Sequence, residues 1–225
     1  MKHWFSSQKK TPFLIILSVL FCSCFGVKAD ITLNQNGSGS LTLEYHISKS
    51  LDSLGKFDGN ERWNTIPVGK ADFERTIDRL PDMKLISFSS KENNKDLVIT
   101  VKMEFLNIES LLSFLDAQGH RSDFSGDAGS GRLVLILNDG KNINKGTSLD
   151  KLLVDITKPY SVSVSMTVPV SGSLKVLNGA GQTMTPVRGS VIQDKGKKIF
   201  CSFPLYEVLT TDNGLKVEFE WSSGR

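Results

Sequence analysis

The strongest structural constraint in this sequence is an alternation of apolar and polar residues with a period of two. It is cleanest at residues 96–105, which read DLVITVKMEF and place Leu97, Ile99, Val101, Met103 and Phe105 on one side. Successive side chains of a strand point to opposite faces, so this period predicts a β-strand with one buried face. Further segments with the same alternation are 41–48 (LTLEYHIS), 160–168 (YSVSVSMTV) and 215–221 (LKVEFEW).

Two segments instead follow the helical period. In residues 71–80 (ADFERTIDRL) the apolar side chains fall on one helical face, and Pro81 ends the helix. In residues 107–119 (NIESLLSFLDAQG) Asn107 is the expected N-cap and Gly119 the natural stop. The residues expected to face inward are Phe73, Ile77 and Leu80 in the first helix and Ile108, Leu111, Leu112 and Leu115 in the second.

These elements predict an α+β fold. Residues 31–137 read as ββαββαβ, an antiparallel sheet with two amphipathic helices on one face, followed by a β-rich C-terminal lobe. The glycine-rich stretch 120–131 is expected to be a flexible connector, because a phosphate loop follows a strand and opens a helix. We expect one α+β domain over residues 30–225, with lobes 30–137 and 147–225.

The first 29 residues have the layout of a secretory signal peptide. Lys2, Lys9 and Lys10 precede an apolar run from Phe13 to Phe21, and no acidic residue occurs before Asp30. The apolar run is too short to cross a bilayer core, which takes about 20 residues. We therefore interpret residues 1–29 as an export signal.

Two processing sites compete. Val27-Lys28-Ala29 puts small residues at positions −3 and −1 of a cleavage between Ala29 and Asp30. Alternatively, Cys24 is the lipidated cysteine of a loose lipobox, with Ser23 before it. Both alternatives carry the rest of the chain across the inner membrane, to the periplasm or cell envelope, with a lipid anchor only in the second.

Charge argues against nucleic acid as a partner. The formal net charge is +3, from 27 basic and 24 acidic residues, but residues 1–29 hold four lysines and no acid. Without them 23 basic residues face 24 acidic ones, a net charge of −1. The apparent basicity therefore belongs to the signal and does not indicate a nucleic-acid surface.

No pattern in the sequence indicates catalysis, a metal or a cofactor. Outside the signal there are two histidines, and His46 lies beside Glu44 on the polar side of its strand, which leaves a metal site short of ligands. Cys201 is the only cysteine beyond residue 29, and its spacing from Ile199 and Phe203 turns it inward. We therefore expect a protein that is not an enzyme.

Three phrases carry a resemblance to a known family. GSGSLTLEYHIS (37–48), LVITVKMEFLNIESLLSFL (97–115) and VPVSGSLKVLNGAG (168–181) resemble the LppM-like domain of bacterial envelope lipoproteins. The resemblance covers about residues 31–221. It implies an exported, often membrane-tethered protein whose fold is similar to tubular lipid-binding modules, with lipid or glycolipid contact and no catalytic residues to carry over.

The leading hypothesis is non-catalytic binding of a lipid or another apolar ligand between the sheet and its helices. The expected partner is a lipid or a membrane surface. The alternative is a structural or protein-interaction module of the cell envelope, which would use exposed strand edges. The candidate ligand-lining residues are Trp63, Phe73, Ile77, Leu111 and Leu115.

Overall fold

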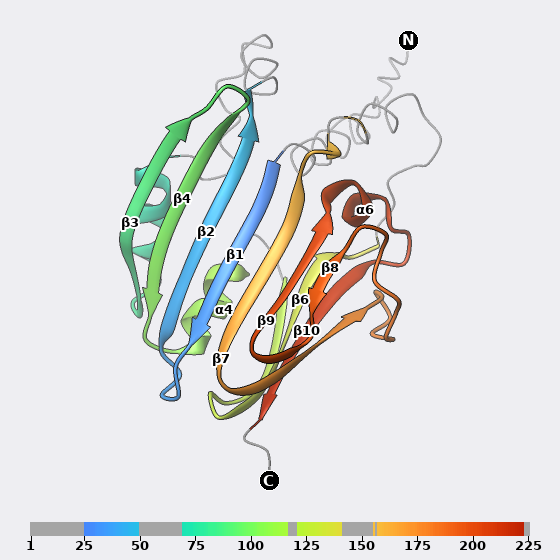
Figure 1. Cartoon of the computed structure of the whole chain (residues 1–225). Helices are drawn as coiled ribbons and strands as arrows, with labels where there is room; N and C mark the ends of the chain where they lie inside the picture. The colour runs from blue at the N-terminus through green and yellow to red at the C-terminus, as the bar shows by residue number, and fades with distance from the viewer. Residues whose placement is uncertain (1–24, 50–68, 117–120, 141–154, 156, 223–225) are drawn as a thin grey trace, which may run out of the picture.

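A computed structural model describes residues 25–49, 69–116, 121–140, 155 and 157–222. Most of these residues belong to strands (Figure 1). The elements, in chain order, are β1 (Phe25–Leu33), β2 (Gly39–Ser48), α3 (Lys70–Ile77), β3 (Met83–Glu92), β4 (Asp96–Phe105), α4 (Ile108–Leu115), β5 (Ser122–Gly126), β6 (Ser130–Asn138), β7 (Ser161–Leu177), β8 (Val191–Gln193), β9 (Lys195–Pro204), α6 (Leu205–Thr210) and β10 (Leu215–Ser222).

The described strands join into one sheet with the order β3-β4-β2-β1-β7-β10-β6-β5, and β9 and β8 continue from β7. Every pairing is antiparallel except that of β1 with β7, which runs parallel from Val27 opposite Val162 to Thr32 opposite Thr167. The predicted α+β class is confirmed. The parallel pair was not predicted, because alternation within a strand carries no information about its neighbour.

Strand β7 is 17 residues long and belongs to both parts of the sheet. Its first half, Ser161–Thr167, pairs with β9, while β1 lies on its other edge. Its second half, Gly172–Leu177, pairs with β10. Strand β6, which was assigned to the first predicted lobe, pairs with β10 of the second. The two predicted lobes therefore share one sheet, which bends along β7 (Figure 1).

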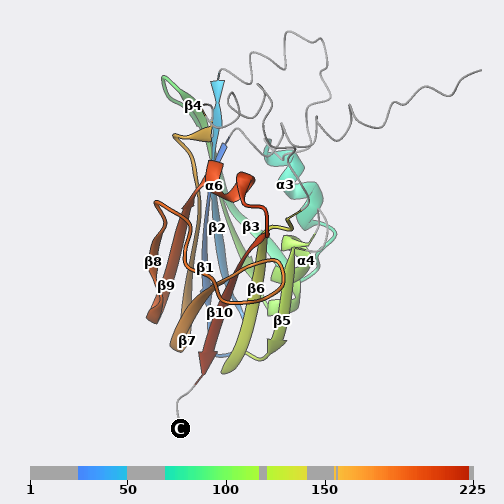
Figure 2. The ribbon, with the colours of Figure 1, turned by 90° about the vertical axis from the view of Figure 1, so that its right-hand side faces the viewer.

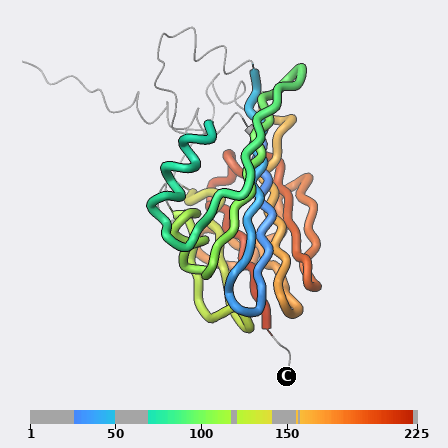
Figure 3. Tube along the Cα trace, turned by 90° about the vertical axis from the view of Figure 1, so that its left-hand side faces the viewer, coloured from blue at the N-terminus to red at the C-terminus, as the bar shows by residue number. Residues whose placement is uncertain are grey.

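Helices α3 and α4 lie on the same face of the sheet, as the sequence predicted (Figure 2). Seen from the β3 edge, α3 lies on one side of the strands, in contact with β3 (Figure 3). The alternation of β4 is confirmed as well, since Ile99, Val101, Met103 and Phe105 are each at most 1% exposed. In α3, Phe73 and Ile77 are buried against the sheet.

The glycine-rich stretch differs from the prediction of a connector. Residues 122–126 form β5, which pairs with β6 through a turn at Asp127. The Asp127 carboxylate accepts hydrogen bonds from the backbone N–H groups of Gly129 and Ser130, at 2.8 and 2.9 Å. Glycine and aspartate are typical of tight hairpin turns. The strand was not predicted because these residues dominate the segment and Phe124 is its only large apolar side chain.

Helix α6 was also not predicted, because its six residues are too few to show a helical period. Among the described residues, no helix has the length and apolar character that crossing a membrane requires.

Candidate functional site

A cavity of about 520 Å³ lies between the sheet and the two long helices. Its volume falls in the range typical of small-molecule sites, roughly 300–1,000 Å³. The described residues that line it are Val27, Ala29, Leu43, Tyr45, Asp72, Phe73, Arg75, Thr76, Arg79, Phe114, Leu115, Arg121, Leu135, Ile136, Leu137, Val162, Ser163 and Val164.

The floor of the cavity comes from four strands. Because side chains alternate along a strand, the inward positions of β1, β2, β6 and β7 meet on one face. In β1 these are Val27 and Ala29, and in β7 they are Val162 and Val164. Ala29 is opposite both Leu43 of β2 and Val164 of β7, so these three residues form one cross-strand row in the floor of the cavity.

One wall is α3, whose Phe73 is fully buried. The Phe73 ring contacts Tyr45 and Phe88, with centroid separations of 6.4 and 6.0 Å. Burial raises the pKa of the Tyr45 phenol from 10.0 to about 12. Tyr45 and Phe73 therefore give the cavity an aromatic wall.

The other wall is α4, which supplies Phe114 and Leu115. Asn107 caps this helix as the sequence predicted, since its side-chain oxygen accepts a hydrogen bond of 2.9 Å from the Ser110 N–H. The Asn107 amide group also donates to the Asp82 carboxylate at 2.8 Å, in the turn between α3 and β3. The cap thus fixes α4 relative to the neighbouring helix.

The residues that line the cavity differ in their exposure to solvent. Among its described lining residues, Arg75, Arg79 and Arg121 are exposed, and all the others are buried or half-buried. The three guanidinium groups therefore mark the side on which the cavity opens to solvent.

The structure places the residues predicted to line a ligand site in different surroundings. Phe73 and Leu115 line the cavity. Ile77 and Leu111 are buried core residues outside its lining. Trp63 and the lipidation candidate Cys24 lie outside the described residues. The cleavage candidates Ala29 and Asp30 lie within β1.

Sequence reasoning missed the contributions of the strands. Leu43, Val162 and Val164 lie at apolar positions of alternating segments, so their inward orientation was predictable, whereas Val27 was assigned to the signal peptide. Their common location was not, because it depends on β1 pairing with β7, which is distant in the sequence.

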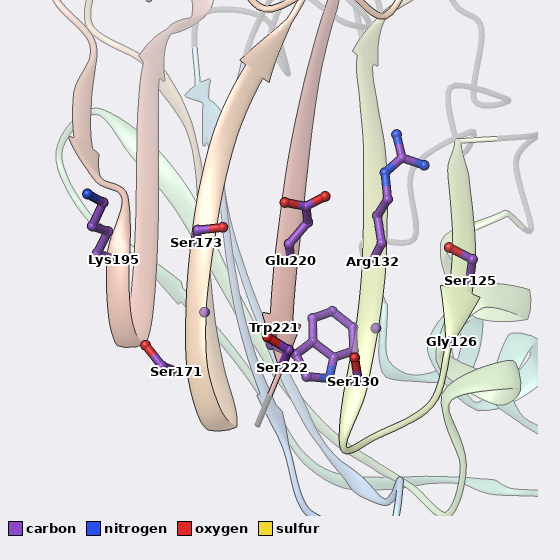
Figure 4. Close-up of a pocket in the computed structure, with 12 residues that line it drawn as sticks. Ser125, Gly126, Ser130, Arg132, Ser171, Ser173, Lys195, Glu220, Trp221 and Ser222 are labelled. Atoms are coloured by element: carbon purple, nitrogen blue, oxygen red, sulfur yellow. The ribbon is translucent and has the colours of Figure 1, made fainter. Parts of the chain in front are cut away.

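A second hollow, open and polar, lies over β5, β6, β10, β7 and β9 (Figure 4). Its volume is about 730 Å³, and serines and glycines dominate its lining. The strand register aligns one polar row across all five strands, namely Lys195, Ser173, Glu220, Arg132 and Ser125.

Two lining residues of this hollow, Arg132 and Glu220, belong to an ionic network with Glu218 and Lys175, which lie outside its lining. Glu218 is only 5% exposed and accepts hydrogen bonds from Arg132 Nε at 2.6 Å and from Lys175 Nζ at 3.1 Å. Lys175 also donates to Glu220 at 2.7 Å. These four charges are paired with one another within the protein. They stabilise the sheet and do not indicate a ligand that the open hollow would bind. The apolar cavity is therefore the candidate functional site.

Cys201 is buried, as its spacing predicted. Burial raises the pKa of its thiol to about 12, which keeps it protonated. His46 Nε2 lies 3.0 Å from Glu44 Oε1, the neighbour expected from the sequence. Among the described residues, no group of three potential metal ligands of the types His, Cys, Asp and Glu comes together.

A comparison with solved structures found a similar chain. The NMR structure of the folded domain of the LppM protein of Mycobacterium tuberculosis aligns with a TM-score of 0.39 and 8% sequence identity, over 89% of this chain and 91% of that one. No protein-family model matches the chain, and no curated protein matches it either. A similarity at this level transfers no functional residue.

Proposed function

We propose that this chain is an exported envelope protein that binds an apolar ligand, such as a lipid acyl chain, without catalysing a reaction. The observation that carries the proposal is the cavity of about 520 Å³ between the sheet and helices α3 and α4. Its floor and walls are mainly aliphatic and aromatic. Each methylene group removed from water there would contribute roughly 0.8 kcal/mol to binding.

Lipid bound to the purified protein is the direct test. The protein is produced from the full chain and purified without detergent, and its organic extract is analysed by mass spectrometry. We expect a stoichiometric lipid. Its absence, together with a specific protein partner recovered by cross-linking, would favour an interaction module instead.

A pair of variants links the lipid to the cavity. Val162→Phe places a larger side chain in the floor of the cavity and should reduce the retained lipid several-fold. Val191→Phe makes the same change on β8, at a site that is 60% exposed and away from the cavity, and should leave retention unchanged. Equal retention by both variants would contradict the proposal, provided that their melting temperatures show that both fold.

For the processing site, we propose cleavage before Cys24 with acylation of that cysteine. Strand β1 begins at Phe25 and pairs along its whole length with β2. Cleavage after Ala29 would remove five of its nine residues, together with two residues that line the cavity, Val27 and Ala29. Cleavage before Cys24 leaves the strand intact and ties the sheet to a membrane through its first residue.

A further inference from the structure

We infer that the cavity selects an acyl chain that ends in an anionic group, such as a fatty acid, and that Arg79 and Arg121 bind that group at the opening. This inference rests on the proposed function and adds the chemistry of the ligand's polar end. Three arginines stand where the cavity meets solvent, while the remaining described lining residues are buried or half-buried.

The three arginines differ in how far they are already paired. Arg75 lies 3.6 Å from the Asp72 carboxylate, three residues earlier on α3. The same carboxylate accepts a hydrogen bond from the backbone N–H of Gly69 at 3.2 Å. Within the described part of the chain, no carboxylate lies within ion-pair distance of the guanidinium of Arg79 or Arg121. These two side chains are therefore available to a ligand.

Their positions bring together two separate parts of the chain. Arg79 follows α3, and Arg121 immediately precedes β5. The backbone N–H of Arg121 donates to the Asp116 carboxylate at 2.8 Å, which holds the start of β5 near the end of α4. Both arginines line the same cavity, and the inference places one anionic group at its mouth within reach of both.

Overall charge does not explain this arrangement. From Cys24 on, the chain has 24 basic and 24 acidic residues and so no net charge, which gives no general attraction to anions. The positive charge at the opening is local, and guanidinium groups match the planar, two-oxygen geometry of carboxylate and phosphate. An apolar interior with a cationic mouth complements an amphiphile with a negative head.

The test compares two ligands of equal chain length. The delipidated protein is titrated by calorimetry with palmitate and with hexadecanol, which lacks the charge. We expect palmitate to bind about tenfold more tightly, because two solvent-exposed ion pairs contribute modestly. The double variant Arg79→Ala/Arg121→Ala should bring palmitate to the affinity of hexadecanol and leave hexadecanol unchanged. Arg188→Ala removes an exposed arginine outside the cavity and should change neither affinity.

The outcomes separate this inference from the proposed function. Equal affinity for palmitate and hexadecanol in the unaltered protein would overturn the role of the arginines and leave apolar binding intact. No binding of either ligand would overturn both. Hexadecanol binding by the double variant also verifies that the cavity has kept its shape.

Discussion

The indole ring of Trp221 lies across Gly131. The register places Trp221 of β10 opposite Gly131 of β6, and a Cβ built on Gly131 would lie 2.5 Å from the indole Cζ2. The indole N–H donates to the Ala128 carbonyl at 3.0 Å, and the ring stacks on Phe124 with a centroid separation of 6.1 Å. The ring therefore occupies the space that a side chain at residue 131 would need.

Gly131→Ala should destabilise the fold because the indole is held by the Ala128 carbonyl and by Phe124 while it covers residue 131. Overpacking of this kind costs roughly 1–3 kcal/mol, measurable as a lower urea midpoint. The matched control is Gly129→Ala in the same hairpin, where the added Cβ would be 3.4 Å from its nearest neighbour, an ordinary contact. The added Cβ would also lie 2.7 Å from the Asp127 carbonyl oxygen, so equal stability of Gly131→Ala and the unaltered protein would show that both the ring and this backbone group can move.

Glu218→Gln should also reduce stability. The change keeps the size of the side chain but removes the negative charge that Arg132 and Lys175 face. Hydrogen bonds to charged groups contribute about 1.5–3 kcal/mol, and solvent around the half-exposed cations lowers the expected loss to about 1–2 kcal/mol. Glu220→Gln, which affects only the ion pair with Lys175, should cost less than about 1 kcal/mol.

The contribution of Glu218 should depend on pH. Burial acts to raise the pKa of this carboxyl, but hydrogen bonds from Lys175 and Arg132 outweigh it, so the pKa lies below its ordinary value of 4.5. A carboxyl with a lowered folded-state pKa stabilises the protein fully above its unfolded pKa and loses that effect as pH falls through the folded value. The stability difference between the unaltered protein and Glu218→Gln should therefore be constant above about pH 5.5 and shrink below pH 4.5. A difference that grows in acid would contradict this assignment.

Truncation tests the importance of the first strand. A chain that starts at Asp30 lacks the half of β1 that pairs with Leu43–Ile47, whereas a chain that starts at Phe25 keeps it. The shorter chain should lose roughly 3–5 kcal/mol, a decrease in melting temperature of about 10 °C. Mass spectrometry of the exported protein gives the complementary result, and a mature N-terminus at Asp30 would refute processing at Cys24.

Asn107→Ala should lower stability by roughly 1–2 kcal/mol through loss of the α4 cap. The variant also removes the hydrogen bond to Asp82, so thermal unfolding should show a decrease at the upper end of the range for cap substitutions. Ser113→Ala alters an exposed residue of the same helix and should have little effect or stabilise slightly. Similar melting temperatures for both variants would mean that the cap contributes nothing measurable.

Local patterns predicted the elements well and their partners poorly. The alternation in β4 and the cap at Asn107 are properties of adjacent residues, and both agree with the structure. The β1–β7 pair joins residues far apart in sequence, and no local period encodes it. Strand β5 was missed because its turn residues outweigh one aromatic side chain.

The same contrast between local patterns and long-range contacts applies to the candidate site. Phe73 and Leu115 were predicted from helical periodicity and do line the cavity. Ile77 and Leu111 share that periodicity but lie in the solid core, since a period identifies a buried face and not a gap in its packing. Arg79 and Arg121 were not predicted, because nothing in the sequence indicates that the two come near one opening.

The parallel pairing of Val27 with Val162 also limits the order in which the chain can assemble. Synthesis proceeds from the N-terminus, so β1 and β2 emerge early and can form their hairpin, while the other edge of β1 has no partner until β7 follows. An unpaired edge is prone to mispairing with other chains. Closure of the sheet is therefore a late event, since that edge of β1 has its partner only after most of the chain has been made.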